Sequence, residues 1–373
     1  MYASVMIPEQ RIRLAHRIKA KREQVGLSQE ALAQASGFKH RQTVTAIEAG
    51  ERSVSPRELA SMAQALGVGV TYFTDRFIST GEAAFSFRAE SDLGGRLAAF
   101  EDLAGRWIAT YSELTERRGG KQSLLLPALS LTPRSSFEDA LAAAEDVREA
   151  LDLGRYPSDE LELALERDWS IPVLYFDGQA GISGAASRFR GLQVILINRS
   201  ESRGRRNFDL AHELFHLLTW DSMPPRRIDD TGPVREEKRV EQLANNFAAA
   251  LLMPETTLRE AWKSRTGGTL EEWISLTAAR LGVSAPALKW RVFNLGLVDK
   301  EDLPTDEALR ASDASEPYDV TPQLFSATFV ERIYNAVESG MLSVRKATQI
   351  LGLTMAEFAD LCRSYGRQLS YEM

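Results

Sequence analysis

The chain has 373 residues, of which 44% are hydrophobic and 26% are charged, and its formal net charge is −7. This composition is typical of a soluble globular protein of two to four domains and excludes a wholly disordered, collagen-like or membrane-spanning chain. No run approaches the ~18 apolar residues that would cross a bilayer, and no secretory signal is recognisable, so we expect a cytoplasmic protein with no membrane partner. The single cysteine, Cys362, excludes a disulfide framework within the chain and a cysteine-based zinc finger.

The charge is unevenly distributed. Residues 1–77 contain eleven Lys and Arg against seven Asp and Glu, a balance of +4, which leaves −11 for the remainder. A basic unit on an acidic body indicates that only the first part meets a polyanion such as DNA. A net charge of +4 is also within the ordinary range for a domain of this size. Sequence motifs, and not charge alone, must therefore show whether this part binds DNA.

The first 75 residues predict a compact all-helical domain. Apolar residues recur at helical spacing, and glycines interrupt them at short intervals. We expect helices at 9–24, 28–36, 40–48 and 55–66, followed by a closing apolar turn at 70–73.

This domain contains the sequence LSQEALAQASGFKHRQTVTAIEAGERSVSPRELASMAQALGV, which resembles the Cro/C1-type helix-turn-helix family. The resemblance covers about residues 11–75 and implies binding to a double-stranded DNA operator, with a homodimer as the favoured form. In the third helix, the expected recognition helix, Arg41 and Gln42 suit contacts with base edges. Gln29 and Thr45 suit phosphate contacts, which position the domain without reading sequence. A helical protein-interaction module with the same fold is the alternative.

The next regions predict a connector and then an α+β domain. AAFSFRAES reads as an extended arm, and a long helix is expected over 93–118. The segment between two strand-like runs is small and flexible enough for a hairpin or an edge strand. The expected order after the connector is helices at 136–153 and 158–167, strands at 171–176 and 192–198, helices at 205–219 and 235–252, and further helices over 254–297. An acidic linker, 299–318, and a helical tail, 321–366, complete the chain.

A metal-binding motif lies in the predicted helix 205–219. His212, Glu213 and His216 form an HExxH sequence, which places both imidazoles on one helix face, one turn apart. Such a pair can bind one Zn²⁺, and Glu213 can take a proton from a metal-bound water. Two histidines in the core of an amphipathic helix are the alternative.

A third ligand is needed for a catalytic zinc site, and the next helix offers Glu236, Glu237 and Glu241. Glu241 shares one face with Asn245 and Ala248 at helical spacing. The residue types alone leave the choice open, since each acid could equally be solvated at the start of a helix.

HELFHLL followed by EQLANNFAAALLMP resembles the ImmA/IrrE family of zinc metallopeptidases over roughly residues 135–297. The resemblance implies a zincin-like fold with one Zn²⁺ per chain, held by His212, His216 and Glu241, and it assigns Glu213 as the general base. Phe215 stands where the family often has Gly, at a variable position of the motif. A His₂Glu site also suits Mn²⁺.

Taken together, the sequence predicts a multi-domain, mostly helical protein with a small β-sheet. The expected parts are a helix-turn-helix domain (1–77), a helical connector (78–134), a zinc metallopeptidase domain (135–298) and an acidic linker with a helical C-terminal domain (299–373).

The resemblance implies a peptidase that cleaves a helix-turn-helix repressor protein, in trans or within itself, to induce stress, mobile-element or defence genes. The alternative is a non-enzymatic transcription factor whose zinc domain is a sensor or dimerisation platform. The loop 221–234 is long enough to cover the site and restrain it, and the alternative is that it merely connects two helices.

Overall fold

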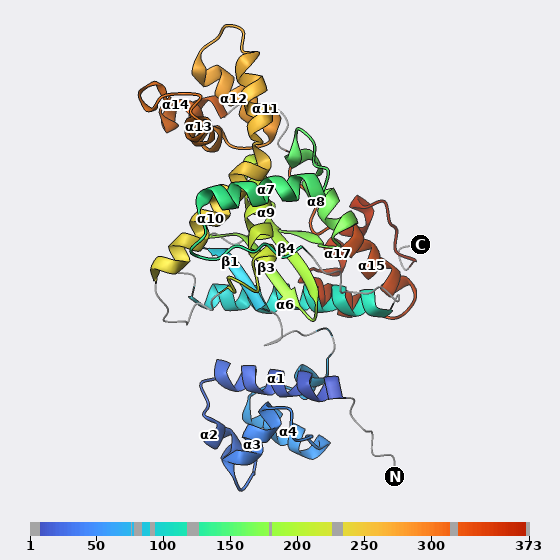
Figure 1. The fold of residues 1–373 in the computed structure, drawn as a ribbon. Helices are drawn as coiled ribbons and strands as arrows, with labels where there is room; N and C mark the ends of the chain where they lie inside the picture. Colours follow the sequence, from blue (N-terminus) through green and yellow to red (C-terminus); the bar gives the residue numbers. More distant parts are fainter. Residues whose placement is uncertain are drawn as a thin grey trace.

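A computed structural model of the chain describes residues 8–75, 77, 84–89, 94–117, 127–178, 181–225, 234–313 and 320–370. This described part contains 17 α-helices, one short 3₁₀ helix and one mixed four-stranded sheet (Figure 1). The predicted class, mostly helical with a small sheet, is confirmed. No described helix has the length and apolar character needed to cross a membrane.

The N-terminal domain, blue in Figure 1, is all-helical as predicted. The hydroxyls of Ser28 and Ser55 accept hydrogen bonds from the first turns of the second and fourth helices and cap them. Ile18, Val44 and Met62 are fully buried at its centre. The helices are α1 (Pro8–Gln24), α2 (Gln29–Ala35), α3 (Arg41–Glu48), α4 (Pro56–Ala65) and α5 (Thr71–Thr74).

The sheet has the strand order β1-β3-β4-β2, with β1 at Ala84–Ala89, β2 at Val173–Phe176, β3 at Ile182–Phe189 and β4 at Leu192–Asn198. β3 pairs antiparallel with both β1 and β4, whereas β2 runs parallel to β4.

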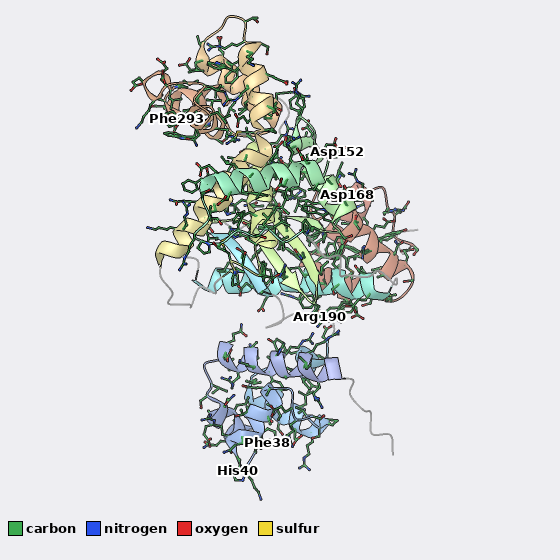
Figure 2. The ribbon with its side chains drawn as sticks, in the orientation of Figure 1. Phe38, His40, Asp152, Asp168, Arg190 and Phe293 are labelled. Carbon is green, nitrogen blue, oxygen red and sulfur yellow. The ribbon has the colours of Figure 1, made fainter. Side chains whose placement is uncertain are left out.

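β3 and β4 form a hairpin through Arg190 and Gly191, which both have positive φ (50° and 83°), as a two-residue type I′ turn requires (Figure 2). The predicted hairpin is therefore confirmed. The alternative of an edge strand is wrong, because the segment predicted as an extended arm forms β1 and covers the outer side of β3.

One face of the sheet is covered by α9 (Arg203–Leu218), which packs against β3 and β4. α10 (Val234–Leu252) lies against α9, and α7 (Phe137–Ala150) against α10. α8 (Pro157–Asp168) packs against β2 at the edge of the sheet. The sheet contributes to this core the buried side chains Val173, Tyr175, Ala186, Ile195 and Ile197.

The opposite face of the sheet is covered by the connector helix and the C-terminal helices. The ring centroids of Trp107 and Phe325 lie 5.0 Å apart, although the two residues are far apart in the sequence. The N–H of Phe325 also donates to the Tyr175 carbonyl of β2 at 2.7 Å. The helices of this layer are α6 (Gly94–Arg117), α15 (Ala327–Glu338), α16 (Val344–Leu351) and α17 (Met355–Ser364). The helical tail therefore shares a core with the connector helix and the sheet.

The remaining helices follow α10 and are drawn in orange at the top of Figure 1. They are α11 (Glu255–Lys263), α12 (Leu270–Leu281), α13 (Ala285–Asn294), the 3₁₀ helix η1 (Lys300–Asp302) and α14 (Asp306–Asp313). α14 lies within the stretch predicted as an acidic linker, and it packs against α12 and α13 with Leu309 fully buried. The loop predicted to cover the site lies mostly outside the described residues, at 226–233.

Candidate metal centre and DNA-binding helix

The polar residues of the HExxH motif are buried in α9. Ser202 caps this helix by accepting a hydrogen bond from the Arg205 N–H. His212, Glu213 and His216 are 1%, 0% and 5% exposed, between the sheet and α10. Burying three titratable side chains is costly unless they are paired or bind a metal, so this helix face is built for a specific contact.

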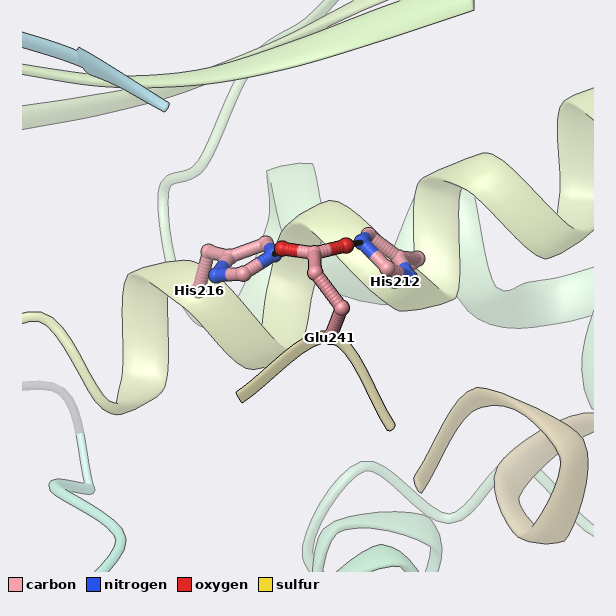
Figure 3. Close-up of side chains that lie close together, drawn as sticks. All are labelled: His212, His216 and Glu241. Atoms are coloured by element: carbon pink, nitrogen blue, oxygen red, sulfur yellow. Dashed lines mark hydrogen bonds and ion pairs between the residues drawn. The ribbon is translucent and has the colours of Figure 1, made fainter. Parts of the chain in front are cut away.

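The two imidazoles and the Glu241 carboxylate converge on one point (Figure 3). The Nε2 atoms of His212 and His216 are 3.1 Å apart. The Glu241 carboxylate, from α10, places one oxygen 3.2 Å from His212 Nε2 and the other 3.4 Å from His216 Nε2. All three ligand atoms lie within 4.8 Å of one another.

These distances fit a zinc ion. Ligand atoms about 2.0–2.1 Å from zinc at tetrahedral angles are separated from one another by about 3.3 Å. The Nε2–Nε2 separation of 3.1 Å lies near that value, and each imidazole approaches a different oxygen of the Glu241 carboxylate, at 3.2 and 3.4 Å. Two His and one Glu are also a donor set that leaves a fourth position open for water or substrate.

Glu241 is held in the form that binds a cation. Burial acts to raise the pKa of this carboxyl, but the contacts with His212 and His216 outweigh burial and lower the pKa below its usual range. Glu236 and Glu237, which the sequence left as alternatives, lie earlier on α10, and their side chains are outside the described part.

Asn245 contacts the first candidate ligand, His212, a contact that the sequence does not predict. Its Oδ1 lies 3.1 Å from Nδ1 of His212, so Nδ1 can donate while Nε2 faces Glu241. Metal-binding histidines commonly have such a partner on the second ring nitrogen. The sequence feature that could have indicated this contact is the position of Asn245, four residues after Glu241 and therefore on the same helix face.

Glu213 faces β3 at a glycine. A Cβ added to Gly184 would lie 3.4 Å from Cγ of Glu213 and 3.3 Å from the Leu196 carbonyl. The strand is also tied to α9 by Arg205, which donates to Ser183 of β3 at 3.3 Å and to Asp209 of α9 at 3.1 Å. The sheet therefore fixes the side of α9 on which the Glu213 side chain lies, next to the candidate metal ligands.

The predicted DNA-contacting residues lie on α2 and α3. Arg41, Gln42 and Thr45 are exposed on α3. Gln29, at the start of α2, bridges the two helices, because its amide donates to Glu48 at 2.8 Å and accepts from Thr45 at 3.0 Å. Figure 2 shows His40, the residue before α3, at the end of this domain that points away from the sheet.

Two family matches agree with this division. Residues 168–293 match the IrrE N-terminal-like domain of peptidase family M78, and residues 18–73 match the family described as helix-turn-helix. The first match includes both helices that supply the metal cluster, and the second includes α2 and α3. No curated protein sequence matches the chain.

Solved structures give only distant similarities. A transcriptional regulator from Mycobacterium tuberculosis is 20% identical over 42% of this chain and 46% of its own, with a TM-score of 0.30. The apo competence regulator ComR from Streptococcus vestibularis is 9% identical over 96% and 97%, with a TM-score of 0.17. A PrgX/iCF10 complex is 11% identical over 96% and 99%, with a TM-score of 0.17. The chain covers less than half of the first structure, and TM-scores this low support no inference about fold or function.

Proposed function

Because the chain joins a helix-turn-helix DNA-binding domain to an IrrE N-terminal-like domain, we propose that it is a DNA-binding regulator with zinc-dependent endopeptidase activity. The observation that supports the activity is the convergence of His212, His216 and Glu241 within 4.8 Å. We propose one zinc per chain on these three residues. We propose that the chain divides into a helix-turn-helix domain (1–77), a helical connector (78–134), a metallopeptidase domain (135–298) and an acidic linker with a helical C-terminal domain (299–373).

In the proposed peptide hydrolysis, a bound zinc ion and the side chains of this chain would have different roles. When bound, zinc would polarise a peptide carbonyl and lower the pKa of a water molecule. Glu213 would act as the general base, because its carboxylate is buried and adjacent in sequence to a ligand. It would take a proton from the attacking water and pass it to the leaving amine. Asn245 would keep Nε2 of His212 directed at the metal.

The proposed substrate is a helix-turn-helix repressor protein, cleaved in trans or within this chain. The ImmA/IrrE resemblance supports this substrate class, and the chain itself contains a domain of that type at residues 18–73. Cleavage would then induce stress, mobile-element or defence genes. A cytoplasmic location and a homodimer on an operator belong to the same proposal.

DNA contact is proposed through α3 and the start of α2. Arg41 and Gln42 are exposed and suited to base edges, and Thr45 lies on the same helix. Gln29 would have to exchange or share its contacts with Glu48 and Thr45 to reach a phosphate. It therefore serves as a phosphate contact and as a link between the two helices.

Metal content and activity are tested together. The purified chain is analysed for zinc, and cleavage of a candidate repressor is compared for the native chain, His212→Ala and Glu213→Gln. The proposal expects about one zinc per native chain, loss of zinc in His212→Ala, and retained zinc without cleavage in Glu213→Gln. Zinc-free chains that take up no added zinc would refute it. An intact cellular response in Glu213→Gln, combined with loss when DNA binding is removed, would instead favour a non-enzymatic transcription factor.

A further inference from the structure

We infer that β1, a segment of the same chain, lies on β3 in the place of an extended peptide substrate and must leave β3 before a substrate can bind. The inference rests on the proposed endopeptidase function, because it names the form in which a substrate reaches the metal site. Its starting point is the family match, which spans residues 168–293 and therefore contains β2, β3 and β4 but not β1. Within the matched region alone, β3 is an edge strand.

The backbone of β3 passes next to the proposed general base. Gly184 has no side chain to separate the strand from Glu213, since a Cβ at this position would lie only 3.4 Å from Cγ of Glu213. Arg205 holds the same stretch of β3 by donating to Ser183. A strand hydrogen-bonded to the outer edge of β3 therefore adjoins the stretch of β3 that packs on the HExxH helix.

β1 has the direction and extent of such a strand. It runs antiparallel to β3, from the pair Ala84 and Arg188 to the pair Ala89 and Ile182. Arg88 is paired with Gly184, the residue beside Glu213, and the register is irregular immediately after this pair. In Figure 3 the blue end of β1 is seen above His216, next to the pale green strands. The chain's own segment thus reaches the part of β3 that adjoins the catalytic helix.

Extended peptides that add to a sheet edge gain affinity from main-chain hydrogen bonds and specificity from alternate side chains. In β1, Phe85 packs partly against the core shared with α6, whereas Ser86 is paired with Ala186, which lies in the core on the α9 side of the sheet. Ser187 adds a hydrogen bond to the Ala84 carbonyl at 2.9 Å. The substrate class is therefore an extended segment with an apolar residue at the Phe85 position and a small one at the Ser86 position. Such a segment must displace β1.

A reversible crosslink tests whether β1 blocks the site. Ser86 and Ala186 are directly opposite each other, and cross-strand pairs have Cα separations within the range of a disulfide. The full chain carrying Ser86→Cys and Ala186→Cys is compared in its oxidised and reduced forms, which differ only in the crosslink. The only native cysteine, Cys362, is buried. The single variant Ser86→Cys, treated with the same oxidant, controls for oxidation elsewhere.

The probe is a fluorescent synthetic peptide with the sequence of residues 82–91, EAAFSFRAES. Its binding is measured by anisotropy on the zinc-treated pair variant that also has Glu213→Gln, so that no cleavage interferes. We expect the reduced form to bind the peptide at least about tenfold more tightly than the oxidised form, since only the reduced form can release β1. Hydrogen exchange should show loss of protection at residues 84–89 when the peptide binds, with β4 unchanged. Equal binding by both forms, or binding by neither, overturns the inference.

Cleavage of the peptide is then measured with Glu213 intact. Cleavage by the reduced form alone supports the peptidase and the displacement of β1. Equal cleavage by both forms leaves the peptidase function standing and overturns the inference. Crosslink-dependent binding without cleavage in either form supports β3 as the binding strand and counts against the proposed peptidase function.

Discussion

Replacing Asn245 by Ala should weaken zinc binding without removing a ligand. Asn245 Oδ1 lies 3.1 Å from His212 Nδ1 and is the contact that directs Nε2 of this imidazole toward Glu241. Loss of such a partner typically costs about 10–100-fold in metal affinity. This factor corresponds to about 1.4–2.7 kcal/mol of binding free energy.

The chain provides a matched control at the next position. Asn246 lies on the same helix, and its amide donates to the Gln242 carbonyl at 2.8 Å, within α10. Zinc affinity of the native chain, Asn245→Ala and Asn246→Ala is measured by competition with a chromophoric chelator at constant pH. We expect a 10–100-fold weaker affinity for Asn245→Ala and at most a twofold change for Asn246→Ala. Equal effects of the two substitutions would show that helix stability, and not ligand orientation, accounts for the loss.

Three further outcomes are expected. Gly184→Val should lower the cleavage rate by about 10²-fold with zinc content unchanged, because its methyl groups would push on Glu213; unchanged cleavage would refute the proposed position of the base. Arg41→Glu should weaken binding to the operator by about 5–150-fold more than binding to random DNA, whereas Lys19→Ala should weaken both equally or not at all, as measured over a range of salt concentrations. Phe329→Ala should lower the free energy of unfolding by about 3–5 kcal/mol in denaturant titrations, and Met355→Ala, at a 56% exposed position, should change it little.

The elements that the sequence predicts well are those with local signals. Ser28 and Ser55 cap helices as their positions predict, and the HExxH spacing places His212 and His216 on one face of α9. Helical spacing predicts that Asn245 and Glu241 share one face of α10. Spacing cannot show which atom of the neighbouring helix Asn245 contacts. The contact with His212 depends on how α9 and α10 pack.

The pairing of β1 with β3 was the part of the sheet that the sequence could not provide. β3 has the sequence ISGAASRF, in which only Ile182 is β-branched, so its residues favour a strand only weakly. Its partner β1 lies about a hundred residues earlier in the chain. Local residue patterns do not show which distant strand a given strand pairs with. For the same reason the amphipathic helices of the tail could be recognised, while their packing on α6 and the sheet could not.

The proposed metal site depends on parts of the chain beyond the family match. Residues 168–293 contain all three proposed ligands and Glu213. They also contain Leu174, Phe176 and Leu196, which are buried on the sheet face opposite α9 by α6 and the C-terminal helices. Without that cover this apolar face would meet water, at a cost of about 1.5–3 kcal/mol for each large side chain. We therefore expect the proposed peptidase activity to require the connector helix and the tail in addition to the matched region, and cleavage should be assayed on the full chain.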